Sequence, residues 1–261
     1  MNYTEGFINV SSGNVYYKII NPQITDKPFL VFLHEGLGCS EQWKDFPQLI
    51  SNSVGCPALL YDRLKYGKSD YSEAIVDSNY MHDEAFEILP KVLENLNIKG
   101  KIILIGHSDG GTISLLYASK NNDKVAAVIT EADHVVCEEI TTGGVRKVVG
   151  EYEKGWLKEM LTKYHKEKTE KLFRGWSGFW LSEDAEKWTI EPHLRNIKVP
   201  VLAIQGKEDR YGSEEQLIVK LMNITGDVNI TFLENCGHIP HHELKENVLH
   251  KMIAFIESEI K

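Results

Sequence analysis

Cysteines are few in this sequence, and long apolar segments are absent. Only four of the 261 residues are cysteines and no two form a CxxC pair, so neither a disulfide scaffold nor a zinc knuckle is indicated. The longest aliphatic runs, 102–105 and 125–129, are far shorter than the ~20 residues that a membrane span requires. The first six residues contain neither the positive cluster nor the apolar block of a signal peptide. These absences predict a cytoplasmic protein with reduced thiols and no membrane partner.

Basic residues are also in the minority. Twenty-nine Lys and Arg against 38 Asp and Glu give a net charge of −9, which disfavours binding to the phosphate backbone of nucleic acids. Hydrophobic residues make up 42% of the chain and charged residues 26%, a balance typical of folded globular proteins. We therefore expect a small-molecule partner and no nucleic acid, and the sequence leaves the oligomeric state open.

Short apolar runs alternate with helical patterns along most of the chain. Two β-branched runs, 7–10 and 15–20, flank a Ser-Ser-Gly-Asn turn signal. Continuous apolar runs, typical of buried strands, occupy 29–33, 58–61, 101–105, 125–129 and 201–204. Helical patterns occupy 79–96, 112–119, 213–222 and 243–260, and the third begins with a capping-box pattern, Ser213 and Gln216. The alternation predicts an α/β fold, with a mostly parallel central sheet and helices on both of its faces.

The segment 134–195 interrupts this alternation, because it contains no convincing strand. Aromatic and apolar residues recur every four positions at Tyr152, Trp156, Met160 and Tyr164, which predicts one amphipathic helix that continues through Gly155. Four of the five tryptophans also lie in this segment. We expect 134–195 to be a helical insertion over a core formed by 1–133 and 196–261.

The strongest functional motif is GHSDGG at 106–111. It follows an apolar strand and opens a helical run, and its G-x-S-x-G core allows the sharp turn that exposes a serine hydroxyl. The N-terminus of the following helix supplies N–H groups and a positive dipole end that would stabilise an oxyanion. Ser108 is therefore the candidate nucleophile.

A serine nucleophile needs a base that a third group orients. The best candidate base is His238, in a loop between the strand-like run 228–233 and the last helix. His241 and His242 lie close by, either as rival bases or as part of a histidine cluster for a metal. Because no acidic residue has metal-site spacing, we expect no metal.

The best candidate acid is Asp209, in the sequence GKEDR directly after the strand run 201–204. A carboxylate at this point would fix the imidazole tautomer and stabilise the imidazolium. The neighbouring Glu208 is expected to point elsewhere. Glu131 and Asp133, at the end of an earlier strand, are the alternative acids.

These motifs resemble the α/β-hydrolase family, and the resemblance spans essentially the whole chain. Ser108, Asp209 and His238 match the family's nucleophile, acid and base in motif, strand context and chain order. The segment 61–69 is similar to the family's Asp-Arg-x-Gly-x-Ser loop, for which the resemblance implies a mainly structural role. The insertion 134–195 resembles the family's helical cap.

The loop LHEGLG at 33–38 looks like the family's oxyanion loop after the third strand. It departs from the family pattern at Glu35, where glycine is usual. The resemblance implies that an oxyanion would be held by the backbone N–H groups of Gly36, with Leu37 as the neighbouring candidate, and of Asp109, the residue after the nucleophile.

The resemblance also implies acyl transfer to water. Family members that open epoxides or remove halides use Asp at the elbow, and Ser108 argues against both reactions. We expect a cofactor-independent serine hydrolase, an esterase acting on a small carboxylic ester through an acyl enzyme. The alternatives are a carbon–carbon bond hydrolase, which uses the same triad, and a ligand receptor of the same fold with slow turnover.

Candidate substrate-binding residues come from two places. The elbow resembles that of the valacyclovir-hydrolase-like branch, in which the residue matching Asp109 is associated with recognition of an amino group; Asp109 would otherwise cap the first helical turn. Trp156 and Trp180 of the insertion are candidates to line the pocket, although packing of the insertion onto the core is an equally good explanation for such large aromatic side chains.

Overall fold

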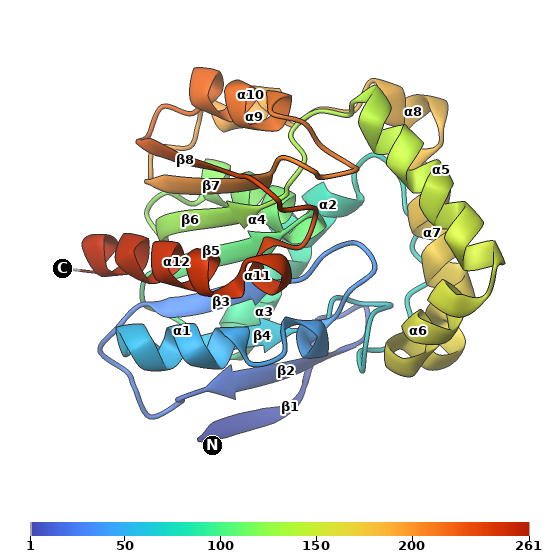
Figure 1. Cartoon of the computed structure of the whole chain (residues 1–261). Helices are drawn as coiled ribbons and strands as arrows, with labels where there is room; N and C mark the ends of the chain where they lie inside the picture. Colours follow the sequence, from blue (N-terminus) through green and yellow to red (C-terminus); the bar gives the residue numbers. More distant parts are fainter. Residues whose placement is uncertain (1, 261) are drawn as a thin grey trace.

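The computed structural model describes residues 2–260, and their strands form one mixed sheet (Figure 1). The strands are β1 (Tyr3–Asn9), β2 (Asn14–Ile20), β3 (Phe29–Leu33), β4 (Ala58–Tyr61), β5 (Ile102–His107), β6 (Val125–Glu131), β7 (Val201–Gly206) and β8 (Val228–Leu233). Their order across the sheet is β1-β2-β4-β3-β5-β6-β7-β8. β2 is antiparallel to β1 and β4, whereas the other neighbours are parallel. The predicted α/β architecture is confirmed.

Helices cover both faces of this sheet (Figure 1). One face carries α1 (Phe46–Val54), α11 (Pro240–Glu243) and α12 (Lys245–Glu259), with the short η1 (Ser40–Trp43). The other face carries α2 (Tyr80–Asp83), η2 (Glu84–Ile88), α3 (Leu89–Asn95), α4 (Asp109–Lys120), α9 (Glu191–Leu194) and α10 (Glu215–Asn223). No helix formed by residues 2–260 is both long and apolar enough to cross a membrane.

The central strands are apolar because they serve two cores at once. Leu30 and Phe32 of β3 pack in the core beneath α1 and α12, whereas Val31 and Leu33 pack in the core beneath α3 and α4. Successive side chains of a strand point to opposite faces, so a strand covered on both faces reads as a continuous apolar run.

Between β6 and β7 the chain forms a group of helices that stands beside the sheet, on the right of Figure 1. These helices are α5 (Glu139–Glu153), α6 (Trp156–His165), η3 (Lys166–Lys168), α7 (Thr169–Trp180) and α8 (Glu183–Glu186). We call α5–α8 the helical lobe. Within 134–195, all of which the structure describes, the β contact is an isolated bridge between Val136 and Thr189. The following helix, α9, packs against α4 and α10 of the core.

The prediction of one helix through Gly155 is wrong. Gly155 has φ 95°, and its N–H donates to Tyr152 O, so α5 ends before it and α6 begins after it. Glycine adopts this conformation at little cost. The four-residue spacing of aromatic side chains is therefore shared between two helices.

Two other helix predictions need correction. The segment 79–96 is divided by the π-helical η2, in which Leu89 N–H donates to Glu84 O, just before Pro90, which has no N–H for the helical ladder. The capping box at Ser213 and Gln216 does not form, because the Gln216 amide is used to bind Val136 O and Glu138 instead.

Candidate active site

Ser108 lies in a tight turn between β5 and α4, with φ 51° and ψ −120°. This conformation is strained for a side-chain-bearing residue. It is held by hydrogen bonds on both sides, from Ser108 N–H to Glu131 O (2.8 Å) and from Gly111 N–H to Ser108 O (2.9 Å). In this turn Ser108 lines the pocket described below.

The two glycines of the G-x-S-x-G motif are required for space. A Cβ atom on Gly106 would lie 2.2 Å from Gly110 O, and one on Gly110 would lie 2.0 Å from Leu33 O. The turn therefore closes only because the β5 end, the start of α4 and the end of β3 meet backbone to backbone.

His238 is paired with Asp209. The ring Nδ1 lies 2.8 Å from Asp209 Oδ2 and 3.0 Å from Oδ1. A carboxylate only accepts hydrogen bonds, so Nδ1 carries a proton and Nε2 of the neutral ring keeps a lone pair. Burial acts to raise the pKa of Asp209, but its contacts with His238 outweigh burial and hold that pKa below its usual range.

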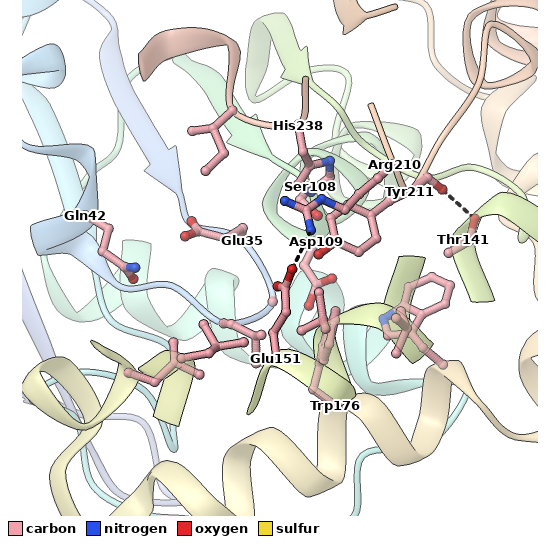
Figure 2. Close-up of a pocket in the computed structure, with 18 of the residues that line it drawn as sticks. Glu35, Gln42, Ser108, Asp109, Thr141, Glu151, Trp176, Arg210, Tyr211 and His238 are labelled. Carbon is pink, nitrogen blue, oxygen red and sulfur yellow. Dashed lines mark hydrogen bonds and ion pairs between the residues drawn. The ribbon is translucent and has the colours of Figure 1, made fainter. Parts of the chain in front are cut away.

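Asp209 is oriented by neighbours of its own. Gln205 Nε2 donates to its Oδ2 (2.8 Å), and Tyr211 N–H donates to its Oδ1 (2.9 Å). Ser108 and His238 line one pocket and lie beside each other in Figure 2. The structure thus brings the three residues that the sequence singled out to one place.

The rival acids and bases are engaged elsewhere. Glu131 Oε2 lies 2.7 Å from His241 Nδ1, and Asp133 forms a fully buried ion pair with Lys220 (2.5 Å). His242 packs its ring against that of His241. Neither alternative acid contacts His238 within the described residues.

Two carboxylates hold the backbone around His238. Glu208 accepts hydrogen bonds from the N–H groups of Asn235 (3.1 Å) and Cys236 (2.5 Å). Glu243 accepts from Gly237 N–H (2.6 Å) and Ile239 N–H (2.9 Å). Glu208 was expected to point away from the imidazole. Glu243 was missed, because no local pattern shows that its side chain returns to the loop.

The loop at 33–38 is held in place through the carbonyl of Glu35. Glu35 O accepts from Arg63 Nη2 (2.9 Å) and His34 Nδ1 (2.8 Å). In a planar trans peptide the C=O and the next N–H point in opposite directions, so Gly36 N–H points away from Arg63. Among residues 2–260 no acceptor is recorded for the N–H groups of Gly36, Leu37 or Asp109.

Segment 61–69 ties these loops together. Asp62 accepts from the N–H groups of Ser40 (2.7 Å) and Lys68 (2.7 Å). Arg63 also contacts the carboxylate of Asp109 (3.4 Å), and both side chains are 3% exposed. The charge of Asp109 is therefore balanced by a guanidinium rather than left unpaired in the pocket.

The pocket has a volume of about 330 Å³ and lies between the core loops and the helical lobe (Figure 2). Its lobe side is mainly apolar: Val145, Val148, Trp156, Leu157, Met160, Leu161, Trp176 and Trp180. Trp180 is 2% exposed, whereas Trp156 is 52% exposed. Trp176 was not predicted to line the pocket; its indole packs over Gly36, where a Cβ would lie 2.3 Å from Nε1.

Comparison with known sequences also indicates an α/β-hydrolase fold. Residues 28–142 match the model of the α/β hydrolase fold family. The chain is 25% identical over 297 residues to a proline iminopeptidase of Saccharolobus solfataricus, with 98% of this chain and 93% of that relative covered. It is 32% identical over 127 residues to a proline iminopeptidase of Heyndrickxia coagulans, with 49% of this chain and 42% of the relative covered.

Solved structures show the same fold. A serine hydrolase from Cycloclasticus zankles matches with a TM-score of 0.79 at 16% identity, with 98% of each chain covered. A 2-hydroxy-6-oxo-6-phenylhexa-2,4-dienoate hydrolase from Rhodococcus matches with a TM-score of 0.77 at 15% identity, with 97% of this chain and 98% of that chain covered. The chain therefore has the α/β-hydrolase fold. The names of its sequence relatives support a hydrolase.

Proposed function

We propose that this chain is a cofactor-independent serine hydrolase that cleaves a small carboxylic ester through an acyl enzyme. The observation that carries the proposal is the pairing of His238 with Asp209 in the pocket that also contains the strained Ser108. Such an arrangement supplies a nucleophile, a base of defined tautomer and an acid that orients the base.

The reaction follows from these positions. Ser108 Oγ attacks the substrate carbonyl as His238 Nε2 takes its proton, while Asp209 stabilises the imidazolium. The N–H groups of Asp109 and Gly36, with Leu37 as the alternative to Gly36, hold the oxyanion. His238 then protonates the leaving group, and water releases the acyl group by the same two steps.

The pocket supports a substrate with a small apolar part. Its volume of about 330 Å³ is at the lower end of the range for small-molecule sites, and its lobe side is apolar. Trp156 and Trp180 contribute to this lining. Because each residue meets the pocket from the helical lobe, we propose that 134–195 acts as a cap that selects the substrate.

Asp109 offers a way to recognise a cationic amino group beside the reacting carbonyl. Asp109 lines the pocket, although its carboxylate is also in contact with Arg63. The likeness to proline iminopeptidases favours testing aminoacyl substrates. If Asp109 has this role, Asp109→Asn will raise KM for amino-acid esters more than for neutral esters. Equal changes in KM for the two classes of ester would contradict the role.

A carbon–carbon bond hydrolase is the second candidate. One relative, from Metapseudomonas resinovorans, aligns over 97% of this chain at 21% identity. It is a 2-hydroxy-6-oxo-6-(2′-aminophenyl)hexa-2,4-dienoic acid hydrolase. The same three residues serve that reaction, so the elbow does not distinguish the two. The third alternative is a ligand receptor with slow turnover. Tight, saturable ligand binding with negligible hydrolysis would favour it.

The deciding experiment compares wild type and Ser108→Ala with a fluorophosphonate probe, short p-nitrophenyl esters, a prolyl p-nitroanilide and a ring-cleavage dienol. Labelling and ester turnover that both disappear in Ser108→Ala support the esterase. Labelling without ester turnover moves the function to whichever other substrate is cleaved, or to a receptor if none is. Full activity in Ser108→Ala contradicts the mechanism.

A further inference from the structure

Glu35 places a carboxylate next to the proposed oxyanion hole. It directly precedes Gly36, its side chain is 22% exposed, and it lines the same pocket as Ser108 (Figure 2). The side chain folds back over its own loop, since a Cβ on Gly38 would lie 2.2 Å from the carboxyl carbon. An unbalanced carboxylate here would repel the negative oxygen of a tetrahedral intermediate. The proposed reaction therefore requires something to balance this charge.

His107, the residue before the nucleophile, lies between Glu35 and the catalytic loop. Its Nε2 is 2.7 Å from His238 O, and its Nδ1 is 3.5 Å from Glu35 Oε2. A carbonyl oxygen only accepts, so Nε2 must carry a proton. In a neutral ring the lone pair of Nδ1 would then face the carboxylate of Glu35. In an imidazolium Nδ1 carries a proton, and its N–H would face that carboxylate.

The surroundings of His107 favour the imidazolium. Its side chain is 1% exposed, and burial alone would lower its pKa; the contact with Glu35, then Glu131 and the bond to His238 O, raise the pKa to about 8. Burial acts to raise the pKa of Glu35, but the contact with His107 outweighs it and leaves that pKa below its usual range. The charged groups and rings that face His107 from neighbouring elements are Glu35, Glu131, His238, His241 and the indole of Trp43.

The other titratable groups around Glu35 and His107 already have hydrogen-bond partners. Glu131 is bound by His241 Nδ1 at 2.7 Å. His34 donates from Nδ1 to Glu35 O and accepts at Nε2 from Arg63 N–H (3.1 Å), which is the pattern of a neutral ring. This leaves His107 as the cation that faces the carboxylate of Glu35.

We propose that Glu35 and His107 form a carboxylate–imidazolium pair, in which His107 holds the backbone of His238 and neutralises the charge that Glu35 places beside the oxyanion hole. Both are positioning residues, and the proposal rests on the proposed function for its catalytic consequence. It also accounts for the departure from glycine at position 35, because glutamate and histidine are needed together.

The pair predicts an unusual pH profile. A triad alone requires only that His238 be neutral, so kcat/KM rises with pH to a plateau. Here the loss of the His107 proton would leave a net negative charge beside the oxyanion and weaken the hold on the His238 carbonyl. We expect kcat/KM to fall again at alkaline pH, with the midpoint near the raised pKa of His107, about 8.

The first test measures kcat/KM for p-nitrophenyl acetate between pH 5 and 9.5, corrected for spontaneous hydrolysis, in wild type and Glu35→Gln. The matched control is Glu41→Gln, a half-exposed glutamate paired with Lys68 at the surface. We expect a bell-shaped profile in wild type and in the control. In Glu35→Gln we expect the alkaline limb to be lost, whatever the plateau value of kcat/KM. A wild-type plateau, or an alkaline limb that survives in Glu35→Gln, would overturn the proposal.

The second test is a double-mutant cycle at pH 7. His107→Asn leaves the Glu35 charge unbalanced, and we expect kcat/KM to fall at least about tenfold. Glu35→Gln added to His107→Asn should recover most of this loss, because it removes the unbalanced charge. A purely structural role predicts additive losses, so a double variant no more active than His107→Asn contradicts charge balance.

One readout does not depend on catalysis. NMR titration of the His107 ring should show a raised pKa in wild type and a lower one in Glu35→Gln. If wild type fails to label with a fluorophosphonate, the proposed function is wrong, and the titration still decides whether the pair exists. If Ser108 labels but the His107 titration is the same in both proteins, the pair is wrong and the hydrolase stands.

Discussion

The two walls of the pocket are built in different ways. On the core side, the loops after β3, β5, β7 and β8 are held by hydrogen bonds to backbone groups, and buried charges are paired. On the lobe side, the pocket is lined by apolar side chains of α5, α6 and α7 that are held mainly by packing. Hydrogen bonds fix geometry sharply, whereas packed apolar surfaces tolerate substitution. The core wall is therefore suited to chemistry and the lobe wall to selecting substrates.

The largest effect should come from the core wall. Asp209→Asn removes the negative charge and places an amide NH2 beside His238, which favours the wrong tautomer, and we expect kcat to fall by about 10⁴-fold with little change in KM. Initial rates on p-nitrophenyl acetate measure this, with Asp123→Asn, an exposed aspartate, as the control. A loss smaller than about tenfold would mean that another group orients the base.

The hydrogen bonds that shape the core wall should matter next. Glu243→Ala frees the N–H groups of Gly237 and Ile239 on both sides of His238. Because small displacements of a catalytic group are costly, we expect kcat/KM to fall about 10- to 100-fold. Glu246→Ala, an exposed residue of α12, is the control. Equal activity in the two variants would show that the loop keeps its shape without Glu243.

The same contrast explains what the sequence could predict. Ser108 and Asp209 follow apolar strands, so their place at the carboxyl edge of a parallel sheet is a local property. The fold class follows from the same alternation and is confirmed. Glu243 and the contact of Arg63 with Glu35 O depend on residues brought together from distant segments, which no local pattern shows. The break at Gly155 was missed because the aromatic spacing continues across it.

The two walls are joined by polar contacts that should be sensitive to acid. His165 of α6 is fully buried; its Nδ1 accepts from Gly67 N–H (3.0 Å) and its Nε2 donates to Leu37 O (2.9 Å). Lys168 donates to Gly67 O and Ser69 O nearby (both 2.6 Å). The bond from Gly67 N–H requires a neutral ring, and burial lowers the pKa of His165.

This join predicts a pH-dependent stability. A histidine whose pKa is lower when folded stabilises the protein above its unfolded pKa, about 6.5, and this contribution is lost as the pH falls toward the folded value. His165→Gln should cost about 1–2 kcal/mol at pH 7 and show a shallower loss between pH 7 and 5. Urea unfolding at several pH values measures both. Identical slopes would assign the acid sensitivity to other buried histidines.

The smallest effect should come from the exposed edge of the lobe wall. Trp156 lines the pocket but is 52% exposed, so its removal loses substrate contact without opening a cavity in the core. We expect Trp156→Ala to raise KM by less than about tenfold, more for longer acyl chains than for acetate, with kcat and Tm nearly unchanged.

Leu181→Ala is the matched control for Trp156→Ala, since Leu181 follows α7, is 39% exposed and does not line the pocket. A KM change that depends on acyl length in Trp156→Ala alone would show that the lobe wall selects by apolar contact. If kcat and kcat/KM instead fall together, as steeply as in Glu243→Ala, the lobe positions the reacting atoms as well, because equal falls indicate an interaction made only in the transition state. The division between a chemical wall and a selecting wall would then be wrong.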